Sequence, residues 1–235
     1  MLNIRPSQER GIADHGWLRS KHSFSFASYY DPQQMGFRCL RVINEDIVQP
    51  SKGFGSHGHR DMEIISYVIT GELEHKDSMG NGSIIRPGEV QYMSAGTGVR
   101  HSEYNASTEH PVHFLQIWIL PDAQNHPPSY GQHDFSAEKQ NQLKLVVDGK
   151  GEENALQINQ DIKLYASCLD KSLRITHRFQ PGRYGWIQVV KGEILISSES
   201  ESLTLVSGDG LAISQEELLH IQANTPAEFL LFDLP

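Results

Sequence analysis

Apolar residues recur along the chain in short runs, either alternating with polar residues or as continuous stretches. A period of two indicates a strand with one buried face, and a short continuous apolar run is typical of a strand buried on both faces. Glycine, proline, asparagine and aspartate separate these runs, and the MGNG sequence at 79–82 predicts a hairpin turn. We therefore expect strands at 39–48, 62–70, 90–95, 112–120, 143–147, 186–190, 193–197, 203–206 and 229–234.

A short repeat indicates that the chain is duplicated. VITGE at 68–72 is matched by VVKGE at 189–193, and RPGEV at 86–90 is similar to VSGDG at 206–210. Both matches occupy the same place in a strand, turn, strand pattern, as expected for two copies of one β architecture. Many short strands joined by turns favour a sandwich or a jelly-roll barrel for each copy.

The segment between the two copies is rich in proline, glycine and polar residues. It spans residues 121–135, and we expect it to be a linker. We therefore predict one barrel over residues 1–130 and a second barrel over residues 131–235. A chain of 235 residues is long enough for two such domains, each with its own core.

The composition of the chain argues against several classes of protein. The net charge of −9 argues against direct nucleic-acid binding, which needs clustered lysine and arginine. The longest apolar runs fall short of the roughly 20 residues that span a bilayer, and residues 1–16 lack the apolar segment of an export signal. Cys39 and Cys168 are far apart and predict no disulfide framework. We expect a cytoplasmic protein that does not bind membranes.

Two pairs of residues carry candidate chemistry: His57 with His59, and His101 with Glu103. With 12 histidines in 235 residues, roughly 0.6 His-x-His pair is expected by chance, so the first pair needs its context. Side chains two residues apart share one face of a strand. If both pairs face the same barrel interior, three imidazoles and a carboxylate converge. Such a set suits iron, manganese, copper, nickel or zinc, and leaves coordination positions open.

The sequence around these pairs resembles a known family. Residues 53–71 resemble the first motif of the cupin superfamily and residues 88–105 the second, with GTGVRHSEYN similar to the pirin branch. Residues 10–32 and 35–68 resemble the amino-terminal half of bacterial pirin-like proteins. The resemblance implies an all-β bicupin, with two jelly-roll barrels in one chain.

The best-studied activity of the group is quercetin 2,3-dioxygenase, so the resemblance implies an enzyme that opens the central ring of a flavonol with dioxygen. It also implies one divalent metal per chain, with Fe(II) first and Cu, Mn, Ni or Zn as alternatives. The implied metal ligands are His57, His59, His101 and Glu103. Glu103 would also accept the substrate's proton, and Phe54 and Gln116 would line the substrate pocket.

A second function is consistent with the same resemblance. Some pirins are non-enzymatic regulators, in which the state of the metal alters a surface that binds a transcriptional or metabolic protein partner. Because both functions use the same metal site, the sequence does not separate them.

The chain departs from the general cupin pattern in ways that bear on the number of metal sites. Cupins usually carry a glutamate five residues after the second histidine, whereas this chain has Ile64 there and Glu63 one position earlier. In pirins the carboxylate comes from the second motif instead, where Glu103 stands. The repeat spacing maps the four ligand positions onto the second half at Arg178, Gln180, Ile221 and Ala223.

None of these mapped residues is a usual metal ligand. His177 and His220 each lie one residue from a mapped position, but together they supply only two ligands. We therefore expect a single metal, in the first barrel, and a second barrel whose role is structural.

Overall fold

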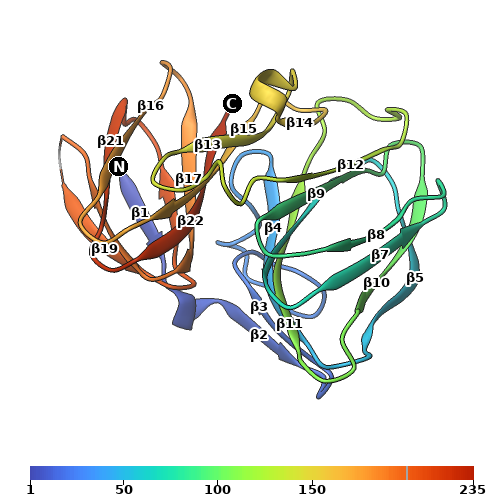
Figure 1. Ribbon diagram of the computed structural model, residues 1–235. Coiled ribbons are helices and arrows are strands. Elements are labelled where there is room, and N and C mark those ends of the chain that lie inside the picture. The colour runs from blue at the N-terminus through green and yellow to red at the C-terminus, as the bar shows by residue number, and fades with distance from the viewer. Residues whose placement is uncertain (200) are drawn as a thin grey trace. The chain divides into compact units, whose positions relative to one another are not determined.

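The computed structural model describes residues 1–199 and 201–235, and its regular structure is almost entirely β (Figure 1). The chain forms two compact units. The N-terminal unit comprises Gly11–Ser136 and Ile158–Gln160, and the C-terminal unit comprises Met1–Arg10, Ala137–Gln157 and Asp161–Pro235. Each unit has a seven-stranded and a four-stranded sheet. The predicted fold class, all-β with two barrels, is confirmed.

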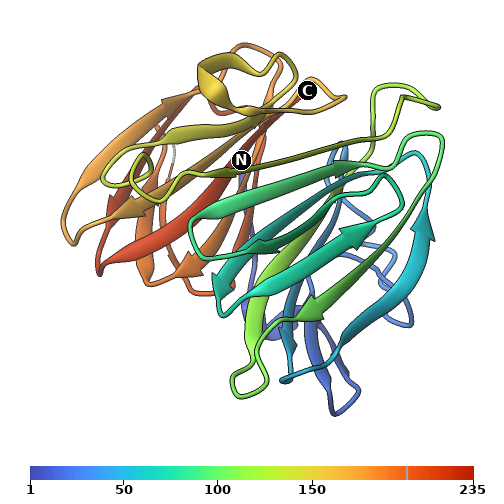
Figure 2. The same cartoon turned by 45° about the vertical axis from the view of Figure 1, so that its right-hand side comes forward.

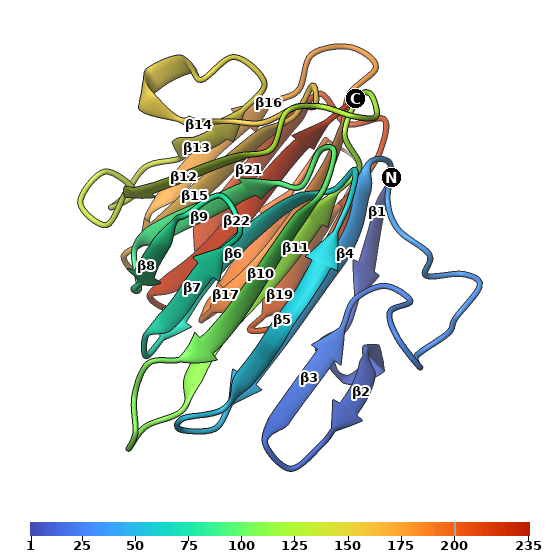
Figure 3. The ribbon, with the colours of Figure 1, turned by 90° about the vertical axis from the view of Figure 1, so that its right-hand side faces the viewer.

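In the N-terminal unit the larger sheet has the order β12-β9-β6-β11-β4-β3-β2, and the smaller sheet has the order β5-β10-β7-β8. Figure 3 shows the smaller sheet in front of β6 and β11. The strands are β2 (Gly11–Asp14), β3 (Leu18–His22), β4 (Leu40–Val48), β5 (Gly53–His59), β6 (Glu63–Thr70), β7 (Leu73–Asp77), β8 (Gly82–Ile85), β9 (Glu89–Ser94), β10 (Val99–Asn105), β11 (Val112–Ile119) and β12 (Ser129–Asp134).

In the C-terminal unit the sheet orders are β1-β20-β17-β22-β15-β13-β14 and β16-β21-β18-β19. Figures 1 and 2 show blue β1 among orange and red strands. Two short 3₁₀ helices, η1 (Ser7–Glu9) and η2 (Glu152–Asn154), accompany them. The strands are β1 (Leu2–Arg5), β13 (Lys144–Asp148), β14 (Leu156–Gln157), β15 (Lys163–Leu169), β16 (Arg174–Arg178), β17 (Tyr184–Lys191), β18 (Glu193–Ser197), β19 (Ser202–Val206), β20 (Gly210–Ile213), β21 (Leu218–Ala223) and β22 (Ala227–Leu234).

The duplication predicted from the repeat is visible at two glycines. Gly71 follows β6 with φ +82°, and Gly192 follows the corresponding strand β17 with φ +79°. A β carbon would lie 2.8 Å from the Pro111 carbonyl oxygen at the first glycine and 2.2 Å from that of Pro226 at the second. Both positions require glycine for the same two reasons, a left-handed backbone and a close strand.

Every predicted strand is present, but the predicted linker is wrong in its second half. Ser129–Asp134 forms β12 and pairs with β9 along its whole length. An edge strand needs partners on one side only, so it tolerates the preceding prolines that made this segment look irregular. The first ten residues belong to the C-terminal unit, because β1 pairs with β20. The observed units therefore differ from a division at residue 130.

The interior of the N-terminal unit is apolar at both ends and polar between them. Along β6, Ile64 belongs to one hydrophobic cluster and Val68 to another, with buried Ser66 between them. On β10, His101 and Glu103 are likewise buried. Within the described residues, no helical segment is long or apolar enough to cross a membrane.

Candidate metal centre

The three histidines predicted as ligands come together on two neighbouring strands. The antiparallel pairing of β5 and β10 places His57 opposite His101, and His59 opposite Val99. The ring centroids are 4.8 Å apart for His57 and His59, 4.5 Å for His57 and His101, and 4.9 Å for His59 and His101. Each ring offers a nitrogen, and these nitrogens lie within 4.8 Å of one another.

The polar atoms of this cluster fit a metal cation. Nδ1 of His57 lies 2.8 Å from the Gly55 carbonyl oxygen, so the neutral ring donates there and keeps its Nε2 lone pair. Nε2 of His59 and both ring nitrogens of His101 are buried without a hydrogen-bond partner among the described residues. Buried nitrogens without partners are rare. A divalent ion would satisfy Nε2 of His59 and one ring nitrogen of His101, so the cluster is able to hold one.

The charge state of the His59 and His101 rings also suits metal binding. Burial, with a smaller contribution from His57, lowers the pKa of His59 to about 4. Burial and the neighbouring imidazoles lower the pKa of His101 to about 3. A lowered histidine pKa favours the neutral form, which is the form that binds metals. For these two rings, protons therefore compete with a metal only in strongly acidic solution.

Glu103 joins the cluster through His101. It is 3% exposed, accepts a hydrogen bond from Ser66 Oγ at 3.2 Å, and accepts one from Gln116 Nε2 at 3.1 Å. Burial raises the pKa of Glu103 to about 7, although both hydrogen bonds oppose this shift. Its carboxylate groups with His101 and His75, again within 4.8 Å. His101 is thus shared by two groups of candidate ligands.

A cavity of about 70 Å³ adjoins the cluster, with His57 and Glu103 on its wall. Phe54 and Gln116, the two residues predicted for the pocket, lie on the same wall. The wall of a second cavity, of about 330 Å³, includes Trp17. The two cavities share four wall residues, namely Phe26, Asn44, Asp46 and Phe54.

Two further aromatic side chains lie on the wall of the cavity of about 70 Å³. Phe26 and Trp118 lie in segments whose aromatic residues are typical of core positions, yet both line this cavity. Their rings meet edge to face, with centroids 5.3 Å apart, and Trp118 also contacts the His59 ring. The alternation of a strand indicates which residues face inward, but not whether the interior is filled.

Known proteins are similar to this chain over its whole length. The family model for Pirin matches residues 4–119, and one described as the quercetinase C-terminal cupin domain matches residues 145–234. A protein of Escherichia coli K12 named quercetin 2,3-dioxygenase is 48% identical over 100% of this chain and 99% of its own length. This chain belongs to the pirin family.

Other pirin relatives extend the comparison. A Pasteurella multocida protein named as a putative quercetin 2,3-dioxygenase is 44% identical, with complete coverage of both chains. The crystal structure of YhhW from Escherichia coli has a TM-score of 0.95 and 46% identity, covering 100% of this chain and 98% of that one. A structure described as bacterial pirin YhhW in complex with nickel(II) has a TM-score of 0.94 and 46% identity, covering 100% and 99%.

His75 of this pirin also lies beside the predicted ligands His101 and Glu103, and it was not predicted from the sequence. It lies on β7 directly opposite Glu103, and it is completely buried. The only signal in the sequence is the alternation of Leu73, His75 and Asp77 before the predicted turn. Because Glu74 and Lys76 flank it, the segment has the composition of a solvent-exposed hairpin.

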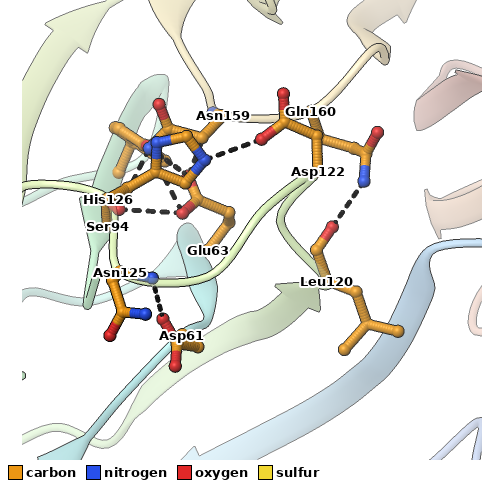
Figure 4. Close-up of polar contacts among 10 residues, drawn as sticks. Asp61, Glu63, Ser94, Leu120, Asp122, Asn125, His126, Asn159 and Gln160 are labelled. Atoms are coloured by element: carbon orange, nitrogen blue, oxygen red, sulfur yellow. Dashed lines mark hydrogen bonds and ion pairs between the residues drawn. The ribbon is translucent and has the colours of Figure 1, made fainter. Parts of the chain in front are cut away.

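Glu63, one residue from the usual cupin glutamate position, has partners outside the histidine cluster. Figure 4 shows its carboxylate with Ser94 and Asn159. It accepts hydrogen bonds from Ser94 Oγ at 2.8 Å and from the Asn159 backbone N–H at 3.2 Å, and it also contacts the Tyr92 hydroxyl. Side chains alternate across a strand, so a shift of one residue from Ile64 places this carboxylate on the opposite face.

The C-terminal barrel of this pirin has different residues at most positions equivalent to the predicted ligands. Its ladder pairs His177 with Leu219, as the first barrel pairs His57 with His101. It also pairs Ile221 with Ile196, as the first barrel pairs Glu103 with His75. The structural equivalents of the four predicted ligands are therefore His177, Phe179, Leu219 and Ile221.

The predicted mapping onto Arg178, Gln180, Ile221 and Ala223 is thus wrong, by one residue in β16 and by two in β21. The turns between strands differ in length in the two barrels, so one offset does not hold throughout. Phe179, Leu219 and Ile221 belong to the hydrophobic core, whereas His177 lies 3.0 Å from the Asp233 carboxylate. Within the described chain, both histidine-containing groups able to hold a metal lie in the N-terminal unit.

We expect the double variant His177→Gln, His220→Gln to retain the metal content of the wild-type protein. His177 occupies a ligand position, but it has only apolar residues where its companions would be. Elemental analysis of the two purified proteins measures this directly. A clear drop in metal per chain in the folded double variant would show that the C-terminal barrel also binds an ion.

Proposed function

We propose that this chain is a metal-dependent dioxygenase that opens the central ring of a flavonol of the quercetin class. The observation that carries the proposal is a group of three imidazoles, His57, His59 and His101, in which His101 also groups with the buried carboxylate of Glu103, beside a cavity in one barrel. The substrate class follows the full-length relatives at 48% identity that are named quercetin 2,3-dioxygenase. The overall reaction combines flavonol and dioxygen into a depside and carbon monoxide.

His57, His59, His101 and Glu103 would hold one divalent transition metal per chain. When bound, such an ion would supply Lewis acidity toward a substrate hydroxyl, and a redox-active ion, unlike Zn, would also supply a route for electrons toward dioxygen. Nitrogen and oxygen donors suit several first-row metals, of which Fe(II) is our first candidate and Ni, Cu, Mn and Zn are the others. The nickel(II) complex of a bacterial pirin supports a metal of this series.

Glu103 is the proposed proton acceptor for the flavonol 3-hydroxyl. The proton leaves the hydroxyl oxygen and bonds to a carboxylate oxygen, which leaves the substrate as an anion. Burial makes Glu103 a stronger base than an exposed glutamate, and a pKa near the working pH is what general-base catalysis favours. Ser66 and Gln116 orient the carboxylate through their hydrogen bonds.

The cavities supply a place for a flat aromatic molecule. Phe26 and Phe54 lie on the wall that both cavities share, and Trp17 packs edge to face on Phe54 with centroids 5.3 Å apart. Aromatic walls favour planar rings and exclude water from the reacting atoms. Asn44 and Asp46 add polar groups on the same wall, where phenolic hydroxyls would lie.

The test is incubation of the metal-loaded protein with quercetin in the presence and absence of dioxygen. We expect loss of the flavonol absorbance and release of carbon monoxide only when dioxygen is present. The His110→Ala variant, altered at an exposed residue, is the control and should match the wild type. If metal-loaded and metal-free protein consumed quercetin equally slowly in air, the dioxygenase proposal would be wrong. The non-enzymatic regulator would then be the better interpretation.

A further inference from the structure

A buried carboxylate and imidazole lie next to the proposed ligands. Nε2 of His75 is 3.2 Å from Oδ2 of Asp77, and both side chains are completely buried. The ladder of β7 and β10 sets Asp77 opposite His101 and His75 opposite Glu103. Two residues of one strand thus face two proposed ligands of its neighbour.

Asp77 is held in place by the hairpin that follows it. Its carboxylate accepts hydrogen bonds from the Met79 backbone N–H at 2.9 Å, from the Asn81 backbone N–H at 3.0 Å, and from Asn81 Nδ2 at 2.9 Å. Three donors besides His75 therefore fix the position of this acceptor. A fixed acceptor in turn fixes the ring of His75.

The pairing also decides which nitrogen of His75 carries hydrogen. An ionised carboxylate only accepts hydrogen bonds, so the neutral ring donates from Nε2 and keeps a lone pair on Nδ1. Within the part of the chain that the structure describes, this buried Nδ1 has no hydrogen-bond partner. The His75 and His101 rings lie with centroids 5.3 Å apart, and each offers a nitrogen within 4.8 Å of the other.

His101 needs a partner of this kind when it binds a metal. One ring nitrogen binds the ion, and the other then carries hydrogen in a buried place where neither nitrogen has a hydrogen-bond partner among the described residues. An N–H left unpaired in the interior is costly. Ligand histidines commonly donate this N–H to a neighbouring acceptor, which sets their tautomer and orientation.

We propose that Asp77 and His75 are positioning residues that hold His101 in the tautomer and orientation of a metal ligand. In this arrangement the second N–H of His101 donates to Nδ1 of His75, and His75 donates from Nε2 to Asp77. The inference rests on the metal site proposed above, but it does not depend on the reaction catalysed there.

The C-terminal barrel gives independent support. Ile196 occupies the place of His75, and Ile221 and Leu219 occupy the places of Glu103 and His101. All three isoleucine and leucine side chains are fully buried in one hydrophobic cluster. The C-terminal barrel therefore lacks an imidazole at the place of His75 and also lacks one at the place of His101. This is expected if the role of His75 is to position His101.

The test measures metal binding rather than catalysis. Cobalt(II) affinity is determined by competition with a chelator for the wild type, His75→Leu, His75→Gln and Asp77→Asn, with His110→Ala as the matched control. We expect His75→Leu to weaken binding by roughly 10- to 100-fold. His75→Gln should recover part of this loss because its carbonyl oxygen still accepts a hydrogen bond. Asp77→Asn should weaken binding less than His75→Leu, and it should alter the cobalt(II) visible spectrum.

Three outcomes would overturn the proposal. One is wild-type affinity with an unchanged spectrum in folded His75→Leu. Another is equal loss in His75→Leu and His75→Gln with a spectrum that has lost one nitrogen ligand, which would make His75 a ligand itself. A wild-type protein without cobalt(II) affinity would remove the metal site as well. Circular dichroism verifies folding, and if His75→Leu does not fold, His75→Gln decides through its affinity and spectrum.

Discussion

Replacing Glu103 with glutamine is expected to lower quercetin turnover by roughly 10² to 10⁴ while most of the bound metal stays. Glutamine keeps an oxygen ligand of similar size, but it has no ionised carboxylate to accept the flavonol proton. In this variant the side-chain carbonyl oxygen still accepts a hydrogen bond from Ser66 or Gln116, but an amide NH2 group replaces one of the two carboxylate acceptors. Metal content and quercetin consumption are measured on the same preparations of both proteins.

The Ser66→Ala variant is the matched control for this experiment. It removes one hydrogen bond to the carboxylate without removing the base, so its turnover should fall by much less than that of Glu103→Gln. Substantial and equal turnover by wild type and Glu103→Gln would refute the catalytic role of Glu103 and leave the metal site intact. Loss of metal from the variant would instead make Glu103 an essential ligand.

Replacing His101 with alanine is expected to reduce the metal content from about one ion per chain to almost none. His101 is the residue common to both groups of candidate ligands, so its loss leaves neither group complete. Quercetin consumption should disappear with the metal. Elemental analysis of purified wild-type and variant protein gives the ratio of metal to chain.

Elemental analysis also gives the results that would contradict this prediction. Two ions per wild-type chain would refute a single site, and full occupancy in His101→Ala would show that the ion lies elsewhere. His110→Ala should keep the wild-type content, which separates loss of a ligand from a general effect of removing a histidine. Thermal unfolding of the metal-free proteins verifies that His101→Ala is folded.

The fold was predictable because strands and turns leave local signals. Alternating and continuous apolar runs marked the central strands such as β6, β11 and β22. Gly71 and Gly192 marked the duplication, since both need a left-handed backbone at a close approach. The edge strand β12 was taken for linker because an edge strand contributes few buried apolar residues and lies behind Pro127 and Pro128.

The proposed site was predictable only where spacing within one strand determines geometry. His57 with His59, and His101 with Glu103, share a face because they are two residues apart. The sequence did not indicate His75 as a site residue, because its role depends on which residue stands opposite it on the next strand. The positions predicted in the C-terminal barrel as equivalents of the ligands were wrong by one or two residues for a similar reason. The register of paired strands depends on the lengths of the turns between them. A short sequence repeat predicts those lengths only for the strands next to the repeat.

The pairing of β1 with β20 has a consequence for how the chain is assembled. Leu2 stands opposite Ile213, so a strand made early in synthesis finds its partner only when almost the whole chain has been made. Contacts this distant in sequence slow folding, and until they form, β20 is an open edge that other chains can join. Loss of the first few residues would therefore damage the C-terminal barrel and promote aggregation, while the N-terminal barrel would keep all of its own strands.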